Sequence, residues 1–184
     1  MLVASGKFDP ARARGSPAMD FKVVEMTDRS PHAKTLQEAA DKSVQRSIYL
    51  PLLRGLTPRT LEVFDFAEQG MVTGSRDSTT VATQALYLLN DPFVRQQALA
   101  LAERLLGRAD MRDTGRLLLA YRLTMGRMPT ARETERAMNY LVEFEAEARA
   151  DAESRLEQGN NPRNAAWASF CQALMASAEF RFVR

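Results

Sequence analysis

The chain has 184 residues, of which 45% are hydrophobic and 26% charged, as in an ordinary globular protein with one buried core. The formal net charge is only +2, and basic residues alternate with acidic ones, as in residues 132–136, which argues against nucleic-acid binding. No segment reaches the roughly 20 apolar residues of a membrane-spanning helix, which excludes membrane insertion.

The first 56 residues form an irregular segment that we expect to pack on the core. Glycines and prolines interrupt it, and it shows no long helical period. Residues 21–26 and 46–53 are rich in β-branched and aromatic side chains, which predicts at most two short strands. Pro51 limits the second to an edge position or a strand end. Residues 34–42 predict one or two turns of helix.

From residue 57 onward the chain carries the start and stop signals of helices. Three polar residues precede proline at expected helix starts, namely Thr57-Pro58, Asp91-Pro92 and Asn161-Pro162. Thr130 and Glu133 form a capping box, in which each side chain satisfies a backbone N–H at the helix start. Expected left-handed stops are Gly107, Gly126 and Gly159.

Between these signals, apolar residues recur at helical spacing in four segments. A further segment, residues 79–89, is apolar on all sides and is expected to be the buried centre. The predicted fold class is therefore mainly α, an antiparallel bundle of about five helices over residues 57–184. We expect this helical domain and the irregular segment 1–56 to form one structural unit.

Several stretches resemble one protein family. They are RSIYLPLLRG, LEVFDFAEQGMVTGSRDSTTVATQALYLLNDPFVRQQALALAERLL, AYRLTMGRMPTARETERAMNYL and WASFCQALMASAEFRFVR, with SGKFDP as a weaker match. They resemble the C-terminal part of domain of unknown function 1553, found in large planctomycete-type proteins that often carry a c-type cytochrome module. The resemblance implies a mainly helical fold, a periplasmic or otherwise exported location, and partners among the other domains of a larger parent, the cytochrome module included.

The chain also departs from the family's large proteins. The haem-binding Cys-x-x-Cys-His motif is absent, and the first residues have no signal peptide, so we expect export information and the companion domains to lie upstream. One cysteine and one histidine argue against a His/Cys metal site, and no motif indicates a cofactor.

The loop of residues 65–80 is the best candidate for a ligand site, because it is long and leads into an apolar helix. Asp65, Arg76 and Asp77 are candidates to meet a polar ligand there. The competing interpretation is an Asp65–Arg76 pair that pins the loop. Gln84 needs partners if buried, which predicts hydrogen bonds to the backbone of the neighbouring loop and, as the alternative, a ligand contact.

Other polar residues are weaker candidates. Arg46 and Tyr49 match the family pattern and face the same loop in one interpretation; in the other, the tyrosine packs and the arginine faces solvent. Cys171 lies among apolar residues and is expected to be a buried small hydrophobe, since a nucleophile would need a neighbouring base. Glu143, Glu145 and Glu147 do not share one helix face and are expected at the surface.

No catalytic residue is predicted. The leading hypothesis is a non-catalytic interaction or structural module of a larger exported protein. The alternative is part of an enzyme site, in polysaccharide breakdown or a redox-coupled reaction, completed by upstream domains. Nucleic-acid binding is the least favoured class because the net charge is close to zero.

Overall fold

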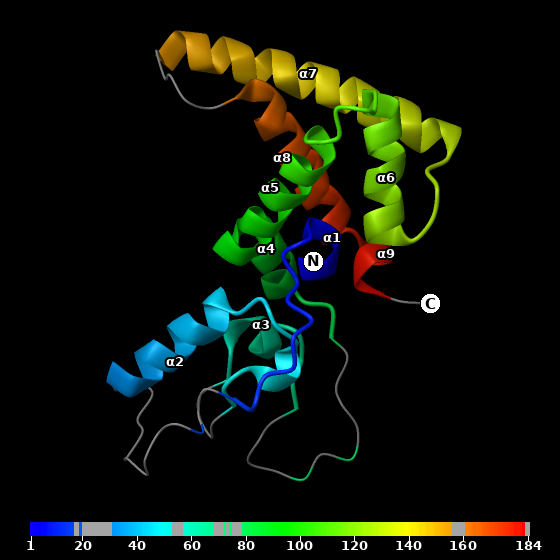
Figure 1. The fold of residues 1–184 in the computed structure, drawn as a ribbon. Coiled ribbons are helices and arrows are strands. Elements are labelled where there is room, and N and C mark those ends of the chain that lie inside the picture. The colour runs from blue at the N-terminus through cyan, green and yellow to red at the C-terminus, as the bar shows by residue number, and fades with distance from the viewer. Residues whose placement is uncertain are drawn as a thin grey trace. The chain divides into compact units, whose positions relative to one another are not determined.

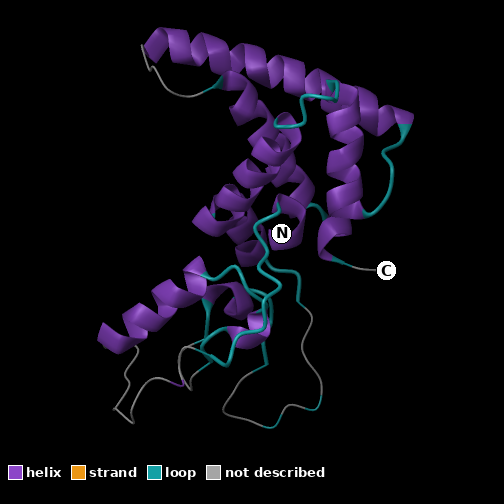
Figure 2. Cartoon of the chain, in the orientation of Figure 1, coloured by secondary structure: helices purple, strands orange, loops and turns teal. Residues whose placement is uncertain are grey.

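The computed structural model describes residues 1–16, 19, 31–52, 57–67, 72, 74, 79–155 and 161–182 (Figure 1). All regular elements in these residues are helical, and they contain no strand (Figure 2), which confirms the mainly α class. The elements are α1 (Leu2–Ser5), α2 (Pro31–Lys42), the short 3₁₀ helix η2 (Ser47–Tyr49), α3 (Arg59–Glu62), α4 (Ala82–Asn90), α5 (Pro92–Leu106), α6 (Asp113–Met125), α7 (Ala131–Arg155), α8 (Pro162–Ala176) and α9 (Ala178–Arg181).

The chain divides into two compact units. The C-terminal unit combines Met1–Lys7 with Leu88–Arg184, and the N-terminal unit is Phe8–Tyr87. The boundary lies inside α4, between Tyr87 and Leu88. Each unit is therefore described by itself.

The core of the C-terminal unit lies where α5, α6, α7 and α8 meet. Helix α8 packs against both α5 and α7, and α6 contacts all three. Trp167 is almost fully buried and meets Phe170 edge-to-face, with ring centroids 6.1 Å apart. The other large, fully buried side chains of this core are Leu101, Leu105, Leu117 and Met175. The helical spacing of apolar residues thus corresponds to one shared core.

Helix α1 joins the C-terminal unit through contacts that sequence reasoning did not predict. The buried Ser5 hydroxyl donates to Gln97 Oε1 at 2.7 Å. The Arg104 guanidinium donates to the carbonyl oxygens of Val3 and Ala4, at 3.2 and 2.7 Å. Because these carbonyls end a four-residue helix, the arginine supplies donors that the helix itself lacks.

Four of the predicted helix boundaries are confirmed. Asp91 and Asn161 each accept a hydrogen bond from the backbone N–H two residues on, at 2.9 and 3.0 Å. The capping box is formed, because Glu133 N–H donates to Thr130 Oγ1 at 3.2 Å and Thr130 N–H donates to Glu133 Oε2 at 2.7 Å. Gly126 ends α6 in the left-handed conformation, with φ 71°. These signals act over two or three residues, so they can be identified from sequence.

Two other boundary predictions are wrong. Helix α3 begins at Arg59 after Pro58, without a side-chain cap from Thr57, and has only four residues. Gly107 ends α5 in the right-handed conformation, with φ −66°. A left-handed glycine is not needed there because Arg116 donates to the carbonyl oxygens of Leu105 and Arg108, at 3.2 and 2.9 Å. Gly159 lies outside the described residues.

The predicted strand at residues 46–53 is also wrong over its described part, residues 46–52. The chain turns there instead: Tyr49 N–H donates to the Arg46 carbonyl at 2.9 Å, and Leu50 N–H to the Ser47 carbonyl at 3.0 Å. These local bonds use the N–H groups that a strand would donate to its neighbour. The other predicted strand, residues 21–26, lies outside the described residues.

Two predicted helices differ from expectation. Helix α2 begins at Pro31 and has 12 residues, so it is longer than the predicted one or two turns. It starts earlier than predicted because proline suits the first position of a helix. Helix α4 is not the buried centre of a bundle, since Leu86 is 57% exposed and Leu89 58%. Only Gln84, Tyr87 and Leu88 of this helix are buried. The other apolar side chains of α4 are exposed.

Candidate functional site

Three residues of the N-terminal unit meet at the predicted loop, and we call them the Asp65 cluster: Asp65, Thr79 and Gln84. The Thr79 backbone N–H donates to Asp65 Oδ2 at 2.8 Å, and the Thr79 hydroxyl donates to Asp65 Oδ1 at 2.7 Å. Gln84 Nε2 lies 3.3 Å from Asp65 Oδ2 and 3.4 Å from Thr79 Oγ1. Two of the predicted candidates, Asp65 and Gln84, are thus brought together by a third residue that the prediction did not include.

The backbone of Asp65 is strained. Its φ is 56°, and it is the only non-glycine residue with positive φ in the part of the chain that the structure describes. Aspartate adopts this left-handed conformation more readily than most residues, although at a cost on the order of 1 kcal/mol. Such strain persists where the surrounding bonds fix the conformation, and both carboxylate oxygens of Asp65 hold the start of the next helix.

Gln84 is 1% exposed, so its amide requires hydrogen-bond partners within the protein. Its nitrogen donates to side chains that belong to the loop preceding α4. The buried amide on α4 thus holds both ends of the loop, Asp65 at its start and Thr79 at its end. The prediction named the backbone of this loop as the partner of Gln84, whereas these two bonds go to side chains of the loop.

The other predicted site residues do not add to the cluster. Arg76 and Asp77 lie outside the described residues, so the predicted Asp65–Arg76 pair lies outside them too. Arg46 is exposed and Tyr49 is half-buried around η2, which fits the interpretation of a packed tyrosine with a solvent-facing arginine.

A second polar constellation, in the C-terminal unit, was missed by sequence reasoning. The Arg127 guanidinium binds two carboxylates in a bidentate manner: Glu133 at 2.9 and 2.7 Å and Glu179 at 2.6 and 2.8 Å. It also donates to the Met128 carbonyl at 3.0 Å, and it lies 5.6 Å from the centre of the Tyr121 ring. These contacts use all five N–H donors of the arginine, so none is left for a ligand.

This arginine clamp connects the start of α7 to α9, and it shifts the pKa values of its members. Hydrogen bonds from Arg127, and then from the Thr130 backbone, lower the pKa of Glu133 to about 2. Hydrogen bonds to Glu179 and Glu133 raise the pKa of Arg127. The clamp therefore stays charged at neutral pH and stabilises the fold near the C-terminal end of the unit.

Replacing Glu133 with glutamine tests this effect as a function of pH. Because the folded state lowers the Glu133 pKa from 4.5 to about 2, its charge stabilises the folded state above about pH 5, and this contribution is lost as the pH falls toward 2. Glutamine still serves in a capping box, so Glu133→Gln removes the charge and keeps the cap. We expect the melting temperatures of wild type and variant to differ at pH 7 and to converge only as the pH approaches 2; a pH-independent difference would contradict the assignment.

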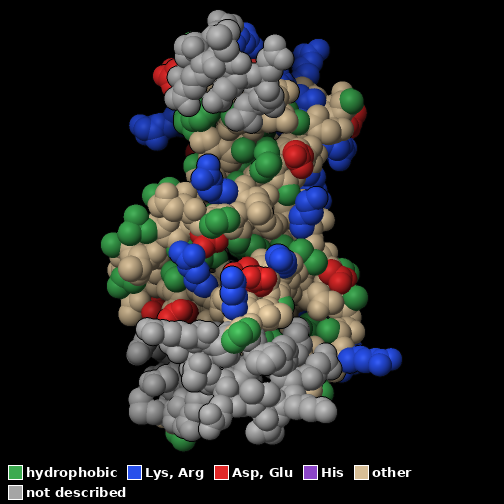
Figure 3. Space-filling model, turned by 90° about the vertical axis from the view of Figure 1, so that its left-hand side faces the viewer, with side chains coloured by type: hydrophobic (Ala, Val, Ile, Leu, Met, Phe, Trp, Pro, Cys, Tyr) green, Lys and Arg blue, Asp and Glu red, His purple; other side chains and the backbone are tan. Residues whose placement is uncertain are grey.

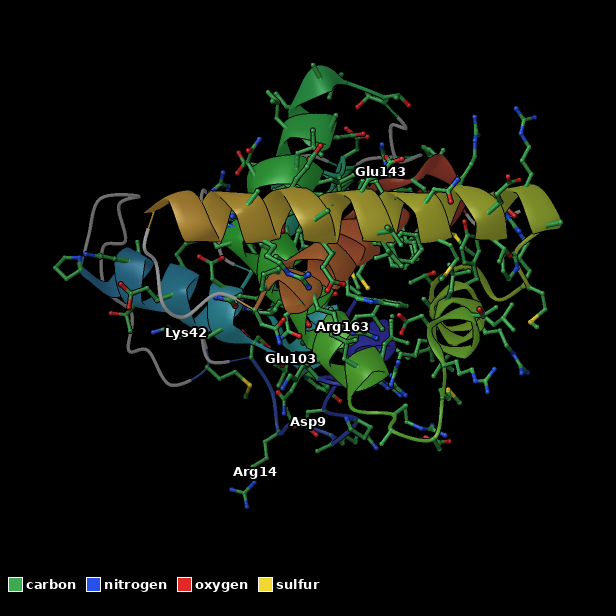
Figure 4. All side chains as sticks on the ribbon, turned by 90° about the horizontal axis from the view of Figure 1, so that it is seen from above. Asp9, Arg14, Lys42, Glu103, Glu143 and Arg163 are labelled. Carbon is green, nitrogen blue, oxygen red and sulfur yellow. The ribbon has the colours of Figure 1, made fainter. Side chains whose placement is uncertain are left out.

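Further charged side chains of the C-terminal unit form ion pairs with one another. Asp113 Oδ1 accepts hydrogen bonds from Arg116 at 2.7 Å and from Arg163 at 2.6 Å, and Figure 4 labels Arg163 on α8. Glu143 is exposed on α7, as expected, and Glu145 pairs with Arg149 at 3.1 Å. On the face shown in Figure 3, basic and acidic side chains lie among one another, as the sequence pattern predicted.

Cys171 is fully buried in the core of the C-terminal unit, as predicted. Burial raises the pKa of its thiol, so the uncharged thiol form predominates at neutral pH. Within the described ranges, no three His, Cys, Asp or Glu side chains come close enough together to hold a metal ion. Among the same residues, no helix combines the length and apolar character needed to cross a membrane.

A protein-family model matches most of the chain. The model of a family described as "Protein of unknown function (DUF1553)" matches residues 1–141, about three-quarters of the chain. The match ends within α7 and includes the irregular first residues, where sequence reasoning saw only a weaker resemblance. No curated protein and no solved structure matches the chain.

Proposed function

Because the chain belongs to the family of unknown function DUF1553, we propose that it is a non-catalytic helical module that packs against other domains of a larger exported protein. The observation that carries this proposal is the Asp65 cluster. Its carboxylate, which was the best candidate to bind a ligand, accepts hydrogen bonds from Thr79 and Gln84 of the same chain.

The polar groups elsewhere support the same role. A catalytic site needs donors or acceptors directed at a substrate, together with a nucleophile or an acid–base group of suitable pKa. In the described residues, the Arg127 donors bind Glu133, Glu179 and a carbonyl, and the Cys171 thiol is buried with a raised pKa. The Arg127 donors are therefore used within the fold, and the Cys171 thiol lies in its core.

The location and the partners are further parts of the proposal. The resemblance to large planctomycete-type proteins supports a location outside the cytoplasm. It also supports partners among the other domains of a parent polypeptide, a c-type cytochrome module included. The near-neutral charge and the intermixed surface charges favour protein partners over nucleic acid.

An immunoblot of native cells tests this proposal. Antibodies raised against the 20.6 kDa chain would be applied to cytoplasmic and exported fractions of its source. We expect a polypeptide longer than the chain, enriched in the exported fraction. A product of about the chain's own mass, confined to the cytoplasm, would overturn both the larger parent and the export.

A further inference from the structure

The arginine clamp of the C-terminal unit holds two carboxylates with one guanidinium. Glu133 Oε1 and Glu179 Oε2 both accept a hydrogen bond from the same nitrogen, Nη2 of Arg127, at 2.7 and 2.8 Å. The three side chains together therefore carry one net negative charge, and the two carboxylates repel each other across this nitrogen. This repulsion opposes the bidentate hydrogen bonds, and it is relieved when one of the carboxylates moves away.

The two carboxylates differ in how firmly the rest of the chain holds them. Glu133 Oε2 also accepts hydrogen bonds from the backbone N–H and the hydroxyl of Thr130, at 2.7 and 2.9 Å, and Glu133 lies in the 25-residue helix α7. Glu179 lies in α9, which has four residues, none of them buried. The side chain of Glu179 is 48% exposed, against 31% for Glu133. The carboxylate that leaves first is therefore that of Glu179.

We propose that α9 is a salt-sensitive latch, which is closed while Glu179 binds Arg127 and opens by a movement of the backbone at Ser177. This inference goes beyond the proposed function, because it concerns a movement within the chain. In the closed state α9 packs against α6 and α8 (Figure 1). Ser177 ends α8 and begins α9, and its backbone is extended, with φ −68° and ψ 153°. A residue at the junction of two helices is a position that absorbs such a change of backbone angles.

The binding position for Glu179 stays formed when α9 leaves. The other contacts of Arg127 are made to Glu133, at 2.9 and 2.7 Å, to the Met128 carbonyl oxygen, at 3.0 Å, and to the Tyr121 ring, whose centre is 5.6 Å away. None of these three residues belongs to α9. Arg127 Nε and Nη2 therefore stay directed at the position of the Glu179 carboxylate, and the latch closes again without rebuilding its site.

Ionic strength shifts the balance between the closed and the open latch. The Arg127 side chain is 38% exposed, so dissolved ions reach the clamp and screen the attraction between Arg127 and Glu179. Ion pairs with this much exposure contribute little to stability, so screening is enough to change the open fraction. Opening also withdraws Phe180, a partly buried side chain that packs against the core in the closed state.

Two backbone hydrogen bonds of α9 report whether the latch is closed. The Arg181 N–H donates to the Ser177 carbonyl at 3.3 Å, and the Phe182 N–H donates to the Ala178 carbonyl at 2.9 Å. A four-residue helix is too short to persist without the packing that holds it, so both bonds are lost when α9 leaves. Hydrogen exchange at these two amides therefore measures the open fraction.

Amide exchange followed by NMR on the full chain, in a series from about 0.05 to 1 M NaCl, tests the proposal. We expect exchange at Arg181 and Phe182 to become faster on the order of two- to fivefold over the series. The Thr134 N–H, which donates to the Thr130 carbonyl at 2.9 Å in the first turn of α7, should keep its rate, because Glu133 stays bound. Exchange in α9 that does not depend on salt, or an equal acceleration at Thr134, would overturn the proposal.

Glu179→Gln tests whether the salt response comes from the clamp. We expect fast exchange at Arg181 and Phe182 in this variant already at low salt, with no further rise as salt is added. The matched control is Glu143→Gln, the same change at an exposed residue of α7, which should keep the wild-type response. Circular dichroism confirms that both variants are folded. The same salt response in Glu179→Gln and in wild type would show that the bond to Arg127 does not hold α9, and would also overturn the proposal.

Discussion

Leu101→Ala is expected to lower the free energy of unfolding by about 2–5 kcal/mol. Leu101 has 0% exposure and lies in the core formed by α5, α6, α7 and α8. Truncation removes buried apolar surface and leaves a cavity that the packed neighbours, Trp167 among them, fill only in part. Urea denaturation followed by circular dichroism at 222 nm, which is the helical signal, measures the change (~2 kcal/mol is readily resolved).

Leu99→Ala is the matched control for this change. Leu99 lies two residues away on the same helix and is 42% exposed, so the identical truncation should cost roughly 0.5 kcal/mol or less. The same substitution in one helix thus separates burial from helix propensity. Equal losses of stability for the two variants would contradict the placement of the core.

Asp65→Ala is expected to cost about 1–3 kcal/mol, because it removes the acceptor of three hydrogen bonds. The amide of Gln84 is 1% exposed and would lose a buried partner. Alanine also tolerates the left-handed φ of 56° poorly, which adds strain. Hydrogen exchange measures the local effect, since the Thr79 backbone N–H would lose its bond to the carboxylate and exchange faster.

Two further substitutions separate the causes of this loss. Asp65→Gly removes the carboxylate and also relieves the backbone strain, so it should destabilise less than Asp65→Ala. Asp65→Asn keeps one carbonyl acceptor and a residue that tolerates positive φ, so it should destabilise least of the three. An equal loss for all three variants would show that the charge of Asp65, and neither its geometry nor its acceptors, is what stabilises the loop.

The local features of this fold could be predicted from sequence because their partners are close in the chain. Asp91, Asn161 and the Thr130–Glu133 box each bond within two or three residues. The apolar periods of α5 and α8 likewise depend only on helix geometry. For the same reason Gly126 was identified as a left-handed stop.

The remaining features depend on contacts between distant residues. Arg116 on α6 replaces the expected left-handed glycine at the end of α5 by binding the carbonyl of Leu105, 11 residues earlier. Arg127 and Glu179 are 52 residues apart, so nothing local indicated their pairing. Helix α4 shows a further limit, because periodicity identifies an apolar surface but not whether a neighbour covers it.

The candidate site was predicted in part. Asp65 and Gln84 were selected because one lies in a long polar loop and the other is polar within an apolar helix, and the structure places them together. Thr79 was not selected, since a threonine before a helix is common and its 14-residue separation from Asp65 gives no signal. Thr79 nevertheless completes the cluster, because its backbone N–H and its hydroxyl donate to Asp65 and its hydroxyl oxygen accepts from Gln84.

The measurement that tests the central claim most directly is a thermal melt of the chain with candidate ligands, run in parallel on wild type and Asp65→Asn. The panel contains neutral and sulfated glycans, divalent metal ions and DNA. A ligand that binds only the folded state raises the melting temperature by mass action. If the Asp65 cluster only holds the loop in place, any ligand-induced shift of the melting temperature should be the same in wild type and in Asp65→Asn. A shift of wild type that is lost in Asp65→Asn would show a ligand site there and contradict the purely structural role of the Asp65 cluster, on which the proposed function rests.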